Sequence, residues 1–169
     1  MKKQKGFSLI ELLIVVAIIL IIAAIAIPNL LRSKMAANEA SAVGSIRTIN
    51  TAQVTYSSTY GVGYTNLANL GTPAGGCATT GGTATLACLL DSNLSGGTKS
   101  GYQFTSVSAT TGTTTAPAVA FDSVAWPVAL GQTGQNAFCS DESGVIRRDT
   151  AGTPGAGKAC ATSSLPPLQ

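Results

Sequence analysis

The chain has 169 residues, of which 10% are charged, well below the roughly 25% of ordinary soluble domains. The formal net charge is +3, and subtracting Lys2, Lys3 and Lys5 leaves seven basic and seven acidic side chains. We therefore expect no nucleic-acid binding through net charge. Histidine is absent, which argues against Ser-His and Cys-His catalysis, and we expect no enzyme activity and no cofactor. The length suits one modest domain with an appendage.

A long apolar run follows the three lysines. From Phe7 to Ile27 the polar side chains are Ser8 and Glu11. As a helix this run extends roughly 31 Å, enough to cross a bilayer core. The lysines before it favour a single-pass orientation with the N-terminus in the cytoplasm and the rest of the chain outside.

A secretory signal peptide has a similar pattern and remains an alternative. Its apolar region is usually about 7 to 15 residues long and ends at a small-x-small cleavage site. The run here is longer, and Glu11 lies only four residues into it, which is unusual for a signal peptide. Ala24 and Ala26 do lie near its end. A secreted enzyme that starts after one of these alanines is therefore the alternative that N-terminal sequencing would test.

The helical pattern continues beyond Pro28. Residues 29–57 are small and polar, and their apolar members recur at helical spacing. We predict one helix from about Phe7 to Ser57, kinked or loosened near Pro28 and again near Gly44. Its second half has one apolar stripe: Leu30, Leu31, Met35, Ala42, Val43, Ile46, Ile49 and Val54.

The remainder of the chain predicts loops and a small sheet. Residues 60–99 are rich in Gly and Thr, which is typical of loops. Near-alternation of apolar side chains and turn-forming residues predict short strands after that, namely Tyr102–Val107, Pro117–Trp126, Ala137–Ser140 and Gly144–Arg148. Four aromatic residues in these strands are expected in the core: Tyr102, Phe104, Phe121 and Trp126. The tail with Pro166 and Pro167 is expected to lack regular structure. The predicted fold class is α+β, with the C-terminal half of the helix packed on an antiparallel sheet.

Four cysteines, Cys77, Cys88, Cys139 and Cys160, all follow the apolar run. With an exported location they indicate disulfides in an oxidising compartment. Three pairings are open, and we favour Cys77–Cys88 with Cys139–Cys160 because both loops are local. A zinc site is the alternative, but the chain lacks histidine and any C-x2-C spacing.

The segment Gly6-Phe7-Ser8-Leu9-Ile10-Glu11 resembles the class III leader boundary of type IV prepilins. In that family a membrane aspartyl peptidase cuts between the Gly and the Phe and then methylates the new amino terminus. Pro28 also matches the proline usual in pilin stems. The resemblance implies four regions: a leader at 1–6, a transmembrane and polymerisation half-helix at 7–28, an amphipathic half-helix at 29–57, and a head at 58–169 with an αβ-loop, a sheet and a C-terminal disulfide region.

Glu11 is the residue from which we infer a mechanism. A carboxylate in a lipid-facing helix costs several kcal/mol, by an estimate on which methods differ. Cleavage after Gly6 creates an amine on Phe7 at a similar depth. Pairing of Glu11 with the Phe7 amine of an adjacent subunit would neutralise both groups and fix the register of assembly. The alternative is a protonated or snorkelling Glu11 near the membrane interface.

The resemblance implies a structural subunit, the major pilin of a type IV pilus that serves adhesion, twitching motility or DNA uptake. Its implied partners are copies of itself, the prepilin peptidase and methyltransferase, and an inner-membrane assembly platform with its ATPases. The subunit would lie in the inner membrane before assembly and in a surface pilus afterwards. A type II secretion pseudopilin and a minor tip pilin acting as a binding module are the alternatives.

Carboxylates in the last third of the chain are weaker candidates for a metal site. Major pseudopilins bind calcium in this general region, and Asp141 with Glu142 resembles a metal-binding pair, as Asp91, Asp122 and Asp149 do more loosely. The chain has no EF-hand spacing. The turn-forming residues of the tetrad Asp141-Glu142-Ser143-Gly144 favour a solvated hairpin turn over a metal site, so we expect no metal.

Overall fold

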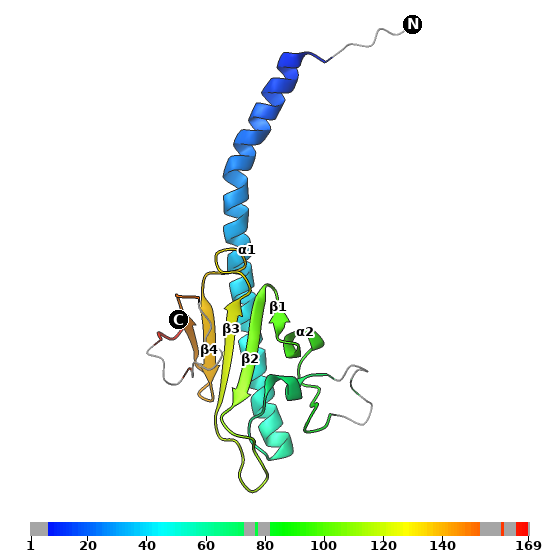
Figure 1. Cartoon of the computed structure of the whole chain (residues 1–169), viewed down its shortest axis with the longest axis vertical. Coiled ribbons are helices and arrows are strands. Elements are labelled where there is room, and N and C mark those ends of the chain that lie inside the picture. Colours follow the sequence, from blue (N-terminus) through cyan, green and yellow to red (C-terminus); the bar gives the residue numbers. More distant parts are fainter. Residues whose placement is uncertain (1–6, 73–76, 78–81, 153–159, 161–164, 169) are drawn as a thin grey trace. The chain divides into compact units, whose positions relative to one another are not determined.

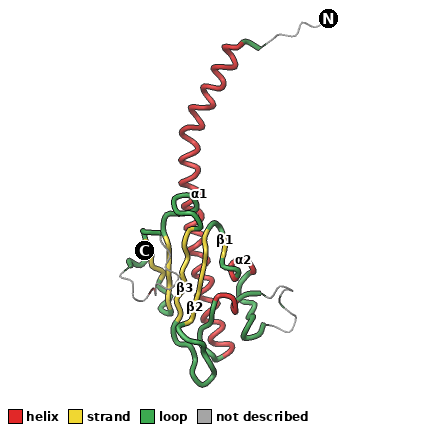
Figure 2. Tube along the Cα trace, viewed as in Figure 1, coloured by secondary structure: helices red, strands yellow, loops and turns green. Residues whose placement is uncertain are grey.

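A computed structural model describes residues 7–72, 77, 82–152, 160 and 165–168 (Figures 1 and 2). The chain divides into two compact units, Met1–Lys34 and Met35–Gln169. We call Phe7–Lys34 the stem and the second unit the head. Helix α1, Leu9–Tyr60, contributes to both units.

Helix α1 follows the predicted range to within a few residues, and helical structure continues through Pro28 and Gly44. In the head part of its apolar stripe is deeply buried, with Ala42, Ile46 and Ile49 fully inaccessible to solvent. Their spacing of three and four residues places them on one helix face. The helix ends where Gly61 adopts a φ of +67° and its N–H donates to the Ser57 carbonyl at 3.0 Å, a left-handed C-terminal cap that glycine favours.

Three short elements lie in the region that the sequence predicts as loop: η1 (Leu67–Leu70), α2 (Ser92–Ser95) and β1 (Thr98–Lys99). Asp91 caps α2 by accepting the N–H groups of Asn93 and Leu94, each at 3.0 Å. The bond from Leu94, and next to it the ammonium of Lys99, hold the pKa of Asp91 below its usual value against a smaller opposing effect of burial. Aspartate is a preferred residue type at helix N-caps, so the sequence alone could have predicted the start of α2 at Asp91.

The head contains one antiparallel sheet in which the strands follow one another in chain order, β1-β2-β3-β4-β5. The four longer strands are β2 (Tyr102–Ser108), β3 (Phe121–Pro127), β4 (Ala137–Asp141) and β5 (Ile146–Asp149). Each corresponds to a predicted strand. The α+β fold class, a long N-terminal helix with an antiparallel sheet, is therefore confirmed.

Polar side chains form a row across the inner face of the sheet. Cα pairing aligns Ser106 with Ser123 and Ser123 with Ser140, and all three serines are buried. The Ser123 hydroxyl donates to that of Ser106 at 2.9 Å. From α1, the amide nitrogens of Gln53 and Asn50 donate to Ser106 and Ser140 at 3.0 and 2.7 Å. These bonds fix the register of the helix on the sheet, because a shift along the helix axis would break them together.

Replacing Gln53 with leucine will destabilise the head by about 1–3 kcal/mol. The Gln53 amide accepts the Thr65 N–H at 3.0 Å and donates to the Thr65 carbonyl at 2.5 Å, so the substitution leaves buried backbone groups unpaired. The change is measured as the free energy of unfolding of the full chain in mild detergent. The same substitution at exposed Gln132 is the control, and equal effects at both positions would contradict the buried network.

The outer face of the sheet carries a second, smaller apolar cluster. It is built from Val124, Cys139 and Cys160, with Trp126 and Leu165 packed against it. Trp126 is therefore half-buried under the C-terminal segment, against this second cluster rather than the larger one. The other three aromatic residues are buried as expected.

The prolines near the C-terminus do not prevent strand-like pairing. The Leu168 N–H donates to the Ile146 carbonyl at 2.8 Å, and the Arg148 N–H donates to the Pro166 carbonyl at 3.2 Å. Since proline lacks only the donor, its carbonyl remains free to accept at an edge strand. Residues 166–168 belong to no strand, as expected, and contact β5 through an isolated bridge between Arg147 and Pro167.

Candidate assembly site

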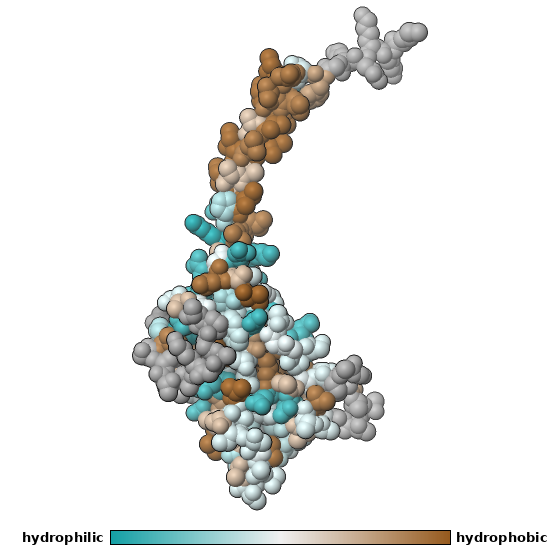
Figure 3. Space-filling model, in the orientation of Figure 1, coloured by the Kyte–Doolittle hydropathy of each residue, from teal (hydrophilic) through white to brown (hydrophobic). Residues whose placement is uncertain are grey.

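The stem exposes an apolar surface that nothing in the described chain covers (Figure 3). Phe7 is 77% exposed and Ile27 is 65% exposed, and the large apolar residues between them are exposed as well. By length and composition α1 is able to cross a membrane. Exposed apolar patches of this extent mark membrane or protein contacts.

Leu30 and Leu31 extend this surface beyond Ile27, and Val54 is a further exposed apolar residue of α1 within the head. The sequence places them on the apolar stripe of the second half-helix, yet they are 71%, 42% and 60% exposed. Met35, Ala42, Ile46 and Ile49, from the same stripe, are buried. The predicted stripe is therefore not buried along its whole length, since Leu30 and Leu31 are exposed on the stem and Val54 is exposed on the head.

Glu11 lies in the first turn of α1, where Ser8 precedes the helix. The Ser8 N–H donates to the Glu11 carboxylate at 2.9 Å. This is one half of a capping box, in which the residue at the third helical position reaches back to the N-cap amide. A carboxylate in the first turn also interacts favourably with the helix dipole. Glu11 is thus bonded to the residue that follows Phe7, while Gly6, on the other side of the expected cleavage point, lies outside the described residues.

Pro28 has no backbone N–H and so removes one hydrogen bond to the carbonyl four residues earlier. Helical structure nevertheless continues on both sides of it. The helix therefore lacks one backbone hydrogen bond at this position, and a missing bond makes a local loosening of the helix easier. The kink remains a prediction.

Gly44 lies within the head, and a methyl group built on it meets no atom within 4 Å. Replacing Gly44 with alanine will therefore stabilise the chain by about 0.5–1 kcal/mol, because alanine loses less conformational entropy in a helix. Thermal unfolding of the full chain in mild detergent measures this change. A decrease in stability would contradict the open helical environment.

Asn38 and Glu39 tie the beginning of the head to the connection between β3 and β4. Glu39 accepts the N–H groups of Gln135 and Asn136 at 2.8 and 3.1 Å. Asn38 donates to the Thr133 carbonyl at 2.9 Å. Sequence reasoning missed these contacts, because nothing in the local pattern pairs residues nearly a hundred positions apart.

The Tyr102 hydroxyl completes this attachment by donating to the Asn136 carbonyl at 2.8 Å. Burial, and next to it the negative charge of Glu39, raises the pKa of Tyr102 well above its usual value. The hydroxyl therefore remains a protonated donor at physiological pH.

All four cysteines lie among the described residues and are joined in two disulfides. Cys77 pairs with Cys88 and Cys139 pairs with Cys160, across 11 and 21 positions of sequence. This arrangement leaves no thiolate for zinc. The first bridge lies in the connection before α2, and the second attaches the C-terminal segment to β4.

The carboxylates considered for metal binding are spread over the head, and the described residues contain no group of three potential ligands. Asp141 accepts the N–H of Ser143 at 3.0 Å and also binds its hydroxyl. Asp122 accepts the Cys160 N–H at 2.7 Å. These bonds belong to a hairpin turn and to the attachment of the C-terminal segment.

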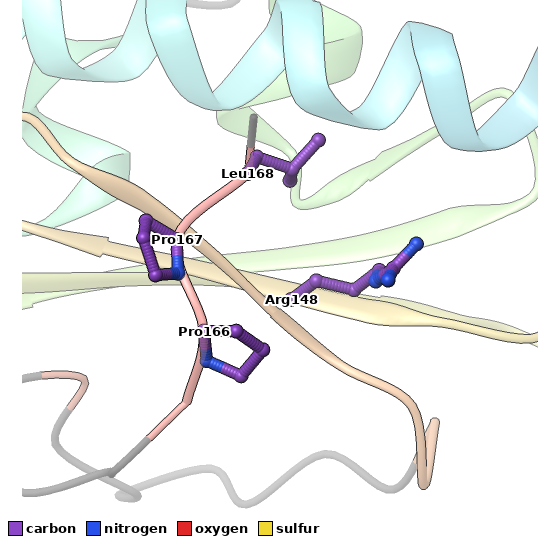
Figure 4. Close-up of a pocket in the computed structure, with 4 residues that line it drawn as sticks. All are labelled: Arg148, Pro166, Pro167 and Leu168. Atoms are coloured by element: carbon purple, nitrogen blue, oxygen red, sulfur yellow. The ribbon is translucent and has the colours of Figure 1, made fainter.

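A cavity of about 440 Å³ lies beside the C-terminal segment (Figure 4). Arg148, Pro166, Pro167 and Leu168 line it. Among these described residues Arg148 is the titratable one, so the lining offers no acid–base pair. The described chain gives this cavity no catalytic constellation.

The model of the prokaryotic N-terminal methylation motif matches residues 1–27. Over 39 residues the chain is 62% identical to the type IV wide pilus major component PilA4 of Thermus thermophilus. Over this segment the chain is therefore similar to type IV pilins. It is also 44% identical over 54 residues to the type IV major pilin protein PilA of Myxococcus xanthus.

The matched segments cover 23% and 32% of this chain, and 30% and 24% of the two relatives. The chain thus spans less than a third of either relative's length. No solved structure matches the chain. The likeness belongs to the N-terminal segment, and the head is described by its own structure alone.

Proposed function

We propose that the chain is a structural subunit of a type IV pilus. Peptidase cleavage between Gly6 and Phe7 and methylation of the Phe7 amine precede assembly. The mature helix holds the subunit in the inner membrane until an assembly platform with its ATPases adds it to the filament. The observation that carries this proposal is an exposed apolar stem with one acidic residue, within a segment that matches the methylation motif.

Within the filament, the exposed surface from Phe7 to Ile27 packs against the stems of other copies. The burial of this surface stabilises the polymer through the hydrophobic effect. Glu11 pairs with the Phe7 amine of an adjacent subunit, because an unpaired charge in an apolar interior is costly. The head, with its two disulfides and its polar surface, then forms the outside of the filament.

The test is electron microscopy of surface filaments, followed by mass spectrometry of the protein that forms the shaft. We expect this chain to be the abundant shaft subunit. A scarce copy number at the filament tip would instead indicate a minor pilin that acts as a binding module. Filaments confined to the periplasm and required for protein export would indicate a secretion pseudopilin, and either outcome would contradict the proposed role.

A further inference from the structure

The stem carries two basic side chains to which the proposed assembly mechanism gives no role. After Glu11 the next charged residues along α1 are Arg32 and Lys34, and both are exposed. Neither cation forms an ion pair within the described residues, where the salt bridge that is present joins Lys99 to Asp91. The hydroxyl of Ser33, which lies between the two cations, donates back to the Asn29 carbonyl at 3.0 Å. The local chain therefore offers the two cations no anionic partner.

The distance along the helix from Glu11 to the first of these cations matches the thickness of the hydrocarbon core of a bilayer. Glu11 and Arg32 are 21 positions apart by subtraction of their residue numbers, which is about 31 Å along an α-helix. The hydrocarbon core of a bilayer is about 30 Å thick. When Arg32 lies at one boundary of the core, Glu11 therefore lies at the other. The helix between them carries no charged side chain.

We propose that Arg32 and Lys34 bind the phosphate groups of anionic phospholipids at the outer face of the inner membrane and so set the resting depth of the stem. Guanidinium and ammonium groups form charge-assisted hydrogen bonds with phosphate oxygens. Exposed Leu30 and Leu31 precede them and enter the acyl boundary, while the long basic side chains extend toward the headgroups. This inference rests on the proposed membrane anchoring of the subunit.

The resting depth has a consequence for Glu11. In the unassembled subunit its carboxylate lies at the inner boundary, where water solvates it at little cost. The carboxylate enters hydrocarbon only when the subunit moves outward, and at that point the Phe7 amine of a neighbour becomes its best partner. The two cations therefore hold the subunit at rest, and the Glu11 pair favours its addition to the filament.

The test measures lipid retention by the full chain, purified in micelles with equal amounts of phosphatidylglycerol and phosphatidylcholine. Native mass spectrometry counts the lipids that stay bound. Each cation contributes about a fivefold preference for anionic lipid. We expect Arg32→Gln and Lys34→Gln each to lower the retention of phosphatidylglycerol relative to phosphatidylcholine by about that factor, with a larger loss in the double variant.

The matched control is the double variant Arg47→Gln and Arg148→Gln, which removes the same charge from exposed positions of the head. An equal loss of phosphatidylglycerol in this control would overturn the proposal, as would displacement of the lipid by excess inorganic phosphate. Lysines at positions 2, 3 and 5 are common to all variants, so they do not affect the comparison.

A second measurement locates the stem in vesicles that contain phosphatidylglycerol. Tryptophan placed by Ile27→Trp, in a chain that also carries Trp126→Phe, is quenched by lipids brominated at known acyl positions. We expect strongest quenching from bromines near the headgroup and a changed depth after loss of both stem cations. An unchanged depth would overturn this inference alone, whereas a chain that does not insert would contradict the proposed anchoring as well.

Discussion

Replacing Glu11 with alanine will lower the yield of filaments by about 100-fold while leaving insertion and the head unchanged. An unpaired charge in hydrocarbon costs about 2.5–3.5 kcal/mol on insertion scales, and 1.4 kcal/mol corresponds to a tenfold change in equilibrium. In the proposed filament this charge is the Phe7 amine of the neighbouring subunit. Sheared surface filaments, quantified by mass spectrometry against the membrane pool of the same subunit, measure the change.

Glutamine at position 11 separates two roles of the carboxylate. The side-chain oxygen of glutamine can still accept the Ser8 N–H, the bond that Glu11 makes within its own chain at 2.9 Å. It has no charge to pair with an amine. We therefore expect Glu11→Gln to assemble as poorly as Glu11→Ala. Recovery of filaments with glutamine would assign Glu11 to local helix capping and would contradict the pairing between subunits.

Removing the Cys139–Cys160 bridge, by serine at both positions, will cost about 3 kcal/mol of stability for a loop of this length. It will also expose Trp126, which packs in the outer cluster with Cys139 and Cys160. Trp126 is the single tryptophan of the chain, so a red shift of its emission reports on the C-terminal segment directly. Unfolding of the full chain in mild detergent gives the stability change.

The variant with serine at Cys77 and Cys88 is the matched control for this experiment. Its bridge spans 11 positions, so we expect a comparable loss of stability of roughly 3 kcal/mol. Neither cysteine belongs to the cluster around Trp126, and the emission of the folded chain should stay the same. A red shift in the control alone, or in neither variant, would contradict the described attachment of the C-terminal segment.

The spacing of apolar residues predicted the long elements of this fold, because a long helix or strand repeats that spacing several times. Helix α1 and strands β2 to β5 have such patterns, and the structure contains all of them. The four-residue helix α2 has no room for a period. Its existence depends on the Asp91 cap and on Leu94, which is fully buried under neighbouring segments.

The buried polar row was beyond sequence reasoning for a different reason. Gln53 and Ser123 are both fully buried, yet each belongs to a residue type that is mostly found at the surface. Their burial is acceptable only because the pairing of strands and helix supplies partners for their polar atoms. Such partners come from distant parts of the chain, and a local pattern does not contain them.

At the candidate site the sequence was informative where chemistry is local. A single acid four residues into an apolar run, together with the resemblance to type IV prepilins, indicated Glu11, Phe7 and Gly6, and the roles of these residues remain predictions. The exposure of Leu30 and Val54 was not predicted, because the pattern shows that a face is apolar and does not show what covers it. The pairing of Glu11 with another subunit remains a prediction for the same reason.

The central claim is that the mature subunit begins at Phe7 and keeps its apolar stem. Mass spectrometry of the N-terminal peptide, from chains isolated out of filaments and out of the membrane, tests this claim most directly. The account predicts a peptide that starts with N-methylated Phe7 in the filament. A filament subunit that retains Lys2, Lys3 and Lys5, or one that starts after Ala24 or Ala26, would contradict it.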